Sequence, residues 1–366
     1  MEGLPGYSVG LAGVVIGAVL GFAARHAKLC TFAAIEDATI GGDTRRLKTF
    51  ALALAIALIG TQAQVVFGLV DPRVTPYVPT ALPWLAATLG GFLFGVGMAL
   101  VGTCAFGSLV RLAGGDLRSL VVLIVFGLVA YATIRGVIAA IRVDVLDGTA
   151  LRLPSLQQGD LPSLISLALP FDTRVALGAA IGLGLLAWAL TDKRLRRSRR
   201  LVAAGAILGL SVVAGWLATA VLSDPLDQAA RVQSLNFVAP VARAIYGALL
   251  GQVGLADFGV AAVLGVVLGA ALAAWRAHEF RWEAFDDQRE MRRHLLGAVL
   301  MGLGGVIAGG CTIGQGLTAA SLLAFAAPLA IAGMILGARV GIFFLVEGST
   351  GRALWRAVHV ARPGEG

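Results

Sequence analysis

The chain has little charge, and long stretches carry none at all. Of its 366 residues only 14% are charged, whereas 58% are hydrophobic. This composition excludes an ordinary soluble globular protein and is typical of a polytopic helical membrane protein. The net charge of +8 therefore bears first on membrane topology, and since no nucleic-acid motif accompanies it, no nucleic-acid partner is expected. The first residues lack the basic region and small-residue cleavage site of a signal peptide, so no cleaved signal is expected.

Cysteine is also scarce. The three cysteines, Cys30, Cys104 and Cys311, are far apart, and no CxxC pair occurs. This spacing excludes a disulfide framework and a zinc site, and it disfavours a thiol oxidoreductase, which normally needs a close thiol pair. No P-loop is present, and none of the five methionines pairs with a cysteine as soft-metal transport would require. We expect no enzyme activity, cofactor or resident metal. A membrane thiol oxidoreductase, or a permease subunit for another anion or a soft metal, remains the alternative to anion transport.

Nine segments are long and apolar enough to cross a membrane. These predicted spans are 8–25, 49–70, 83–101, 117–140, 173–191, 201–222, 257–275, 294–310 and 327–346. When the loops between them alternate between the two sides, most Lys and Arg residues gather on one side, including the run Lys193 to Arg200. The positive-inside rule then places the N-terminus outside and the C-terminus in the cytoplasm.

Four apolar pieces between these spans are too short to cross. They are 29–40, 104–112, 234–250 and 311–325. Each alone would be interpreted as an amphipathic surface helix, but their regular placement favours re-entrant half-helices. The expected fold class is an all-α polytopic membrane protein with about nine transmembrane helices, four re-entrant half-helices and an hourglass-like inverted repeat.

Two glycine-rich boxes that each contain one cysteine indicate the repeat. GVGMALVGTCAFG covers 95–107, and GGVIAGGCTIGQG covers 304–316. Aligning Cys104 with Cys311 also superposes five glycines, and the odd span between the halves makes the second enter from the other face, so that substrate sites lie near the midplane. The predicted organisation is a first repeat over 1–141, an outside loop, connecting span and basic inside loop over 142–200, a second repeat over 201–347 and a cytoplasmic tail over 348–366.

The boxes have the chemistry of an anion site. Glycines let the backbone leave a helix and approach a ligand, and irregular backbone in a membrane is tolerated where it lines a path. Half-helix N-termini attract anions, and a thiol adds a soft sulfur with a weak donor. Thr312 and Gln315 flank Cys311 and either donate to an oxyanion or satisfy the broken backbone. Arg111 either attracts the anion or extends to the membrane surface. A lone membrane cysteine is usually a small hydrophobe, but all three here begin half-helices.

The segments GTCAFGSLVRLAGGDLRSL and AGGCTIGQGLTAASLL, with LCTFAAIED near the start, resemble the YeeE/YedE family of bacterial sulfur-compound transporters. The resemblance implies an inner-membrane protein that takes up thiosulfate or a related sulfur anion, with Cys311, Cys104 and Cys30 as outer, central and inner relay residues. It also implies two partners, the lipid bilayer and a small cytosolic sulfur-carrier protein. The segments 142–172 and 224–250 match no motif of the family. The candidate substrate-binding residues are Cys311, Cys104, Cys30, Gly310, Thr312, Gln315, Gly102, Thr103 and Arg111.

Overall fold

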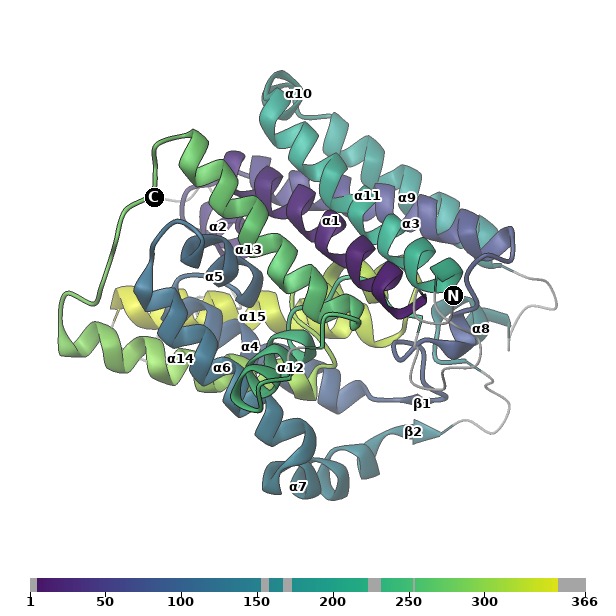
Figure 1. Cartoon of the computed structure of the whole chain (residues 1–366). Helices are drawn as coiled ribbons and strands as arrows, with labels where there is room; N and C mark the ends of the chain where they lie inside the picture. Colours follow the sequence, from purple (N-terminus) through teal and green to yellow (C-terminus); the bar gives the residue numbers. More distant parts are fainter. Residues whose placement is uncertain (1–4, 153–157, 167–172, 223–231, 253, 348–366) are drawn as a thin grey trace.

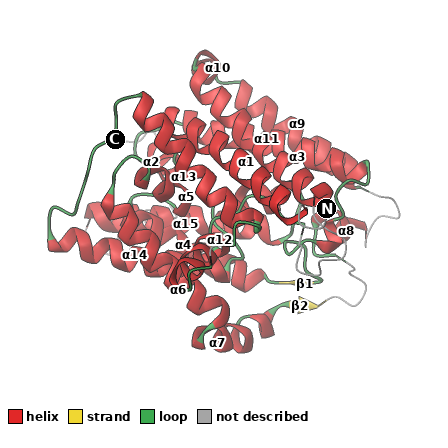
Figure 2. Cartoon of the chain, viewed as in Figure 1, coloured by secondary structure: helices red, strands yellow, loops and turns green. Residues whose placement is uncertain are grey.

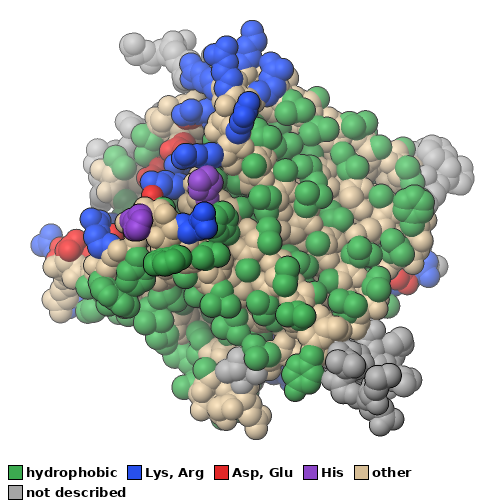
Figure 3. All heavy atoms as spheres, turned by 45° about the horizontal axis from the view of Figure 1, so that its top comes forward, with side chains coloured by type: hydrophobic (Ala, Val, Ile, Leu, Met, Phe, Trp, Pro, Cys, Tyr) green, Lys and Arg blue, Asp and Glu red, His purple; other side chains and the backbone are tan. Residues whose placement is uncertain are grey.

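The computed structural model describes residues 5–152, 158–166, 173–222, 232–252 and 254–347, and the predicted tail 348–366 lies outside them. The described part is helical, as Figures 1 and 2 show, apart from one short antiparallel pairing of β1 (Ala81–Leu82) with β2 (Leu151–Arg152). Apolar side chains cover much of the surface, and Lys and Arg gather at one end (Figure 3). The chain is an all-α polytopic membrane protein, as its composition predicted.

A long helix lies at each of the nine predicted spans. These helices are α1 (Pro5–His26), α3 (Arg45–Val66), α4 (Trp84–Val101), α6 (Leu117–Arg135), α9 (Arg174–Leu190), α11 (Arg199–Leu222), α13 (Phe258–Arg276), α14 (Gln288–Ile307) and α15 (Ala326–Glu347). Seven of the described helical stretches are long and apolar enough to cross a membrane. Of the others, α9 has only 17 residues, and α14 begins with a charged turn. Nine spans therefore stay a prediction.

Short helices lie within all four predicted half-helix segments. They are α2 (Thr31–Thr39), α5 (Ala105–Leu112), α12 (Ala239–Leu249) and the π-helix η3 (Gly314–Ala319). Whether they enter and leave on one side of the membrane remains a prediction. The remaining short elements are α7 (Val137–Val145), α8 (Leu161–Ser166), α10 (Lys193–Arg197), η1 (Pro72–Val74) and η2 (Asp147–Thr149).

One predicted span end and one predicted helix type differ from the structure. The span predicted to reach residue 140 ends at Arg135, because the extended Gly136 separates α6 from α7. The half-helix predicted over 311–325 is not a regular α-helix. Its π-helical part covers six residues, and Thr318 N–H donates to Ile313 O at 3.0 Å, one residue further back than in an α-helix. Glycine is a poor α-helix former, and the two in this segment help to explain why a wider turn replaces the regular one.

Glycines bring α4 and α14 into backbone contact. A Cβ at Gly90 would lie 2.9 Å from Gly304 O, and one at Gly304 would lie 2.6 Å from Gly90 O and 2.4 Å from Phe94 N. Gly97 and Gly297 face one another in the same way, with a Cβ on either lying 2.6 to 2.8 Å from the other's carbonyl oxygen. In the sequence alignment Gly90 corresponds to Gly297, and Gly97 to Gly304. Exchanging the two aligned stretches therefore turns the contact of Gly90 with Gly304 into that of Gly297 with Gly97, as a two-fold repeat requires.

The larger helix pairs follow the same exchange. Helix α1 packs along α13 and α4 along α15, while α11 packs on α3 and α14 on α6 (Figure 1). When α1, α3, α4 and α6 are matched in order with α11, α13, α14 and α15, the first two pairings become the last two. Inside this bundle three of the short segments meet, since Thr31 lies next to both Cys104 and Thr312.

Candidate functional site

Each glycine–cysteine box bends at a position whose backbone conformation only glycine adopts without strain. Gly102 ends α4 with φ of 77°, and Gly309 follows α14 with φ of 75°. These values lie in the left-handed region, where a side chain is strained. Cys104 and Cys311 each follow their glycine by two residues. The matched geometry explains why both boxes share this spacing.

Both cysteines accept a hydrogen bond from the backbone three residues further on, but only Cys104 is the N-cap of a short helix. The half-helix predicted to begin at Cys311 begins three residues later, at Gly314, with Ile313 as its N-cap. Cys104 Sγ accepts a hydrogen bond from Gly107 N–H at 3.4 Å, and Cys311 Sγ accepts one from Gly314 N–H at the same distance. Cys104 is the N-cap of α5, as predicted, and Cys30 is the N-cap of α2, although its side chain makes no capping bond. All three cysteines are free thiols, and Cys104 and Cys311 are completely buried, whereas Cys30 is half-buried.

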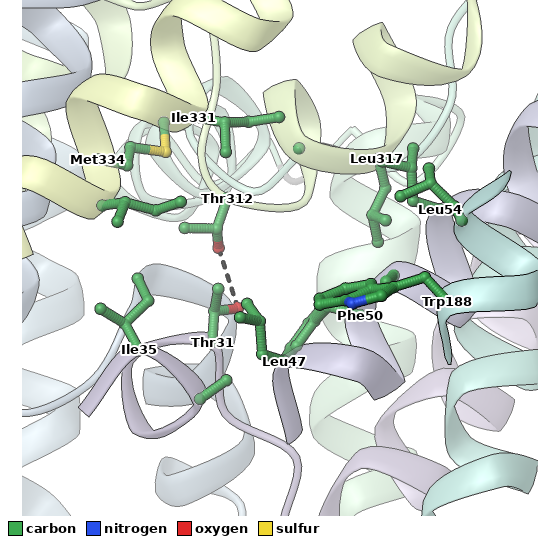
Figure 4. A pocket seen from close by; sticks show the side chains of 15 residues that line it. Thr31, Ile35, Leu47, Phe50, Leu54, Trp188, Thr312, Leu317, Ile331 and Met334 are labelled. Carbon is green, nitrogen blue, oxygen red and sulfur yellow. Dashed lines mark hydrogen bonds between the residues drawn. The ribbon is translucent and has the colours of Figure 1, made fainter. Parts of the chain in front are cut away.

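Each cysteine has a threonine next to it in the sequence, and these hydroxyls join the segments. Cys30 Sγ lies 3.6 Å from Thr103 Oγ1, and Cys104 Sγ lies 4.0 Å from Thr31 Oγ1. Thr31 also accepts from the Thr312 hydroxyl at 3.3 Å, the dashed line in Figure 4. Thr31 therefore links the first half of the chain to the segment that begins at Cys311.

The contacts among Cys30, Thr103, Cys104, Thr31 and Thr312 form a column, which continues beyond Cys311 to an aromatic end. Cys311 S–H donates to Asn236 Oδ1 at 3.8 Å, and Asn236 Nδ2 donates to the Tyr77 hydroxyl at 3.3 Å. Tyr77 is 8% exposed and meets the ring of Trp216 edge-on at 5.9 Å. Thiols, hydroxyls and one amide thus follow one another from Tyr77 to Cys30.

The Cys30 end opens into a cavity of about 380 Å³. Cys30 and Thr103 line it together with four cations, namely Arg25, Lys28, Arg46 and Arg111. Glu279 lies 3.6 Å from Arg25 and 3.7 Å from Lys28, and Asp37 pairs with Arg46 at 3.0 Å.

Arg111 differs from the other three cations. No carboxylate of the described chain pairs with it; its Nη2 instead donates to Gly102 O at 3.0 Å. Its charge is thus left available beside Cys30, where a cation attracts anions from solution.

The other predicted site residues are backbone supports. Gln315 Nε2 donates to Ala308 O at 2.7 Å, and Gly310 N–H donates to Gly305 O at 2.8 Å. Gln315 therefore satisfies the broken backbone of α14, which was one of its two interpretations. Sequence reasoning missed Thr31 and Tyr77 as members of the column. Thr31 had a signal, because it follows Cys30 as Thr312 follows Cys311, whereas nothing in the sequence marked Tyr77.

Apolar helices around broken segments that meet at a buried column of thiols and hydroxyls define a membrane transporter with a path for a small solute. The chain matches the family model described as Sulphur transport over residues 26–340 and belongs to that family. This confirms the resemblance to YeeE/YedE proteins and speaks against a thiol oxidoreductase.

Three relatives show how far the similarity extends. The chain is 28% identical over 354 residues to the thiosulfate transporter TsuA of Escherichia coli, covering 90% of this chain and 93% of that protein. It is 29% identical over 338 residues to TsuA of Spirochaeta thermophila, covering 89% of this chain and 96% of the relative. A probable transporter, YedE of Escherichia coli, is 31% identical over 110 residues, which is 30% of this chain and 25% of that protein.

Proposed function

We propose that this protein carries thiosulfate, or a closely related sulfur anion, across the bacterial inner membrane into the cytoplasm. The observation that carries the proposal is the alternation of sulfur and hydroxyl contacts among Cys30, Thr103, Cys104, Thr31 and Thr312. The two TsuA relatives, which match along nearly their whole length, support thiosulfate as the substrate.

The chemistry of the column suits an anion with two unlike ends. Thiosulfate has a soft, weakly hydrated sulfur at one end and strongly hydrated oxygens at the other. Each Cys–Thr neighbour pair offers a soft thiol beside a hydroxyl that donates to oxygen. The proposed path passes the anion from Cys311 to Cys104 and then to Cys30. A thiolate would repel the anion, so transport requires that these thiols are neutral.

Sulfate should pass less easily because all of its ends are oxygens. Weak S–H donors replace its water poorly, and one unmet buried hydrogen bond costs about 1–3 kcal/mol. At each thiol this is about one to two decades of discrimination in affinity. Half-helix dipoles and Arg111, in contrast, attract both anions because both are doubly charged.

The orientation that we propose places the Tyr77 end outside and the Arg111 cavity in the cytoplasm. The support is that the cavity's cations belong to the loops that gather Lys and Arg, which the positive-inside rule assigns to the cytoplasm. The exchange of contacts between α4 and α14 supports two inverted halves, with 1–141 and 201–347 as their predicted boundaries. A small cytosolic sulfur-carrier protein that accepts the anion at this cavity is part of the proposal and rests on the family resemblance.

The test is uptake of radiolabelled thiosulfate by proteoliposomes, together with growth on thiosulfate in a bacterium that lacks its own uptake system. We expect Cys104→Ala and Cys311→Ala each to lower the initial rate at least about tenfold, the loss expected from about 1.4 kcal/mol at one step. Cys104→Ser keeps the shape but supplies a stronger donor, and should let sulfate compete better. A double alanine variant that transports at the wild-type rate, at equal membrane abundance, would contradict the relay. A wild-type protein that moves sulfate as fast as thiosulfate would contradict the substrate.

A further inference from the structure

A second cavity, of about 360 Å³, lies beside the column rather than along it. It is enclosed by α3, α9 and α15, with α2 and η3 at its inner end (Figure 4). Its walls are apolar side chains such as Phe50, Leu54 and Met334, and only two hydroxyl-bearing residues, Thr31 and Thr312, reach it. The cavity thus borders the hydroxyl pair that links the two halves of the column.

The outer wall faces the surface that the bilayer covers. Trp188 lines the cavity and is 43% exposed, and Phe50 and Ile335 are half-buried. Outside the cavity the same helices carry exposed apolar residues, among them Leu183 on α9 and Leu336 on α15. An opening with such a rim leads to hydrocarbon rather than to water.

A cluster of cations lies at one end of this cavity. Lys193, Arg194, Arg196, Arg197, Arg199 and Arg200 are all exposed, and they cover the basic end seen in Figure 3. Within the part of the chain that the structure describes, none of the six pairs with a carboxylate.

Packing ties this basic cluster to the cavity. Leu195 of α10 is buried in a cluster with Ala51 and Leu185, which both line the cavity. Lys48 lies 5.8 Å above the ring of Trp188 and bonds the carboxylate of Asp192 at 3.2 Å. Asp192 also accepts hydrogen bonds from the backbone at the start of α10. Its carboxylate therefore already has partners other than the six cations, and the cluster keeps a strong positive charge.

We propose that an anionic phospholipid binds here, with one acyl chain in the cavity and its headgroup phosphate on the α10 cluster. An apolar cavity that opens to the bilayer matches an acyl chain, and six cations that form no ion pair in the described chain match a phosphate. A tryptophan at the rim is typical of the membrane interface. The bound chain covers Thr31 and Thr312 from the bilayer side and keeps water out of that flank of the column. The proposal does not depend on which solute the column carries.

The test fills the cavity from within. A Cβ at Gly316 would meet only Ile331 Cγ1, at 4.0 Å, so Gly316→Leu places its side chain in the cavity without a backbone clash. We expect this variant to retain at least about tenfold less phosphatidylglycerol through purification than the wild type does, as measured by native mass spectrometry. Gly184→Leu is the matched control. It adds the same side chain on the exposed face of α9, where a Cβ meets nothing within 4 Å, and should keep the lipid.

The charge is tested separately. Arg194→Gln combined with Arg196→Gln and Arg197→Gln should lower retention of phosphatidylglycerol but not of phosphatidylcholine, in vesicles that contain both. Should Gly316→Leu fail to fold, Ala51→Phe fills the same cavity from α3 and should give the same loss. The proposal is overturned if the filled variants retain as much phosphatidylglycerol as the wild type, or if the wild type retains phosphatidylcholine equally well. Lipid retention is measured without transport, so the result tests the lipid proposal independently of the assignment of thiosulfate as the substrate.

Discussion

Replacing Thr31 by valine tests the column at its centre. Valine has nearly the shape of threonine, so the change exchanges a hydroxyl for a methyl group with little effect on packing. The hydroxyl lies 3.3 Å from Thr312 Oγ1 and 4.0 Å from Cys104 Sγ, and both of these neighbours are buried. The variant therefore leaves two polar groups short of a partner at the point where the halves meet.

The expected size follows from the cost of one unmet buried hydrogen bond, about 1–3 kcal/mol. If this cost falls on the step that moves the anion past Cys104, initial uptake slows by about fivefold to about 150-fold. The folded protein also loses stability, because each buried group left without a partner costs about 1–3 kcal/mol, so uptake is compared at equal amounts of folded protein. Thr31→Ser returns the hydroxyl and should recover most of the rate.

The assay is initial uptake of radiolabelled thiosulfate by proteoliposomes, with thermal unfolding measured in parallel. Thr133→Val is the matched control, because Thr133 is completely buried in α6 and donates to Val129 O at 2.8 Å within its own helix. It makes the same chemical change away from the column and should leave uptake unchanged. Uptake by Thr31→Val within about twofold of the wild type, less than the smallest loss expected from an unmet bond, would refute the reasoning.

Three further predictions concern packing, charge and topology. Gly304→Ala puts a methyl group 2.4 Å from Phe94 N and should destabilise the protein by about 1–3 kcal/mol in thermal unfolding, whereas Gly184→Ala should not; equal stability would mean that α4 and α14 do not touch as described. Arg111→Gln should slow thiosulfate exchange from the cytoplasmic side by about threefold to tenfold at low salt, and the difference should vanish at high salt, where the charge is screened; a loss unaffected by salt would argue against attraction. An impermeant maleimide should label Gly148→Cys from outside and Arg194→Cys from the cytoplasm. Labelling of both from one side would remove the odd connecting helix α9 and with it the inverted repeat.

Local rules recovered much of this protein from its sequence. Long apolar stretches predicted a helix at every span, because the cost of leaving backbone groups unpaired in a bilayer leaves few other structures. The two boxes predicted where helices break, since Gly102 and Gly309 occupy backbone conformations that other residues rarely adopt. The start of α5 at Cys104 followed from the same pattern. Each of these features depends on residues that are neighbours in the chain.

Only the tertiary structure decided how the column is assembled. Thr31 meets Thr312 across 281 positions of sequence and Cys104 across 73, and Asn236 meets Tyr77 across 159. No local periodicity records such contacts, because they depend on how whole helices pack. The π-helical turns of η3 also escaped prediction, since glycine makes the regular helix costly but does not say which wider turn replaces it. The sequence by itself determined a membrane bundle interrupted by short segments. Packing determined that the thiols and hydroxyls at residues 30–31, 103–104 and 311–312 meet.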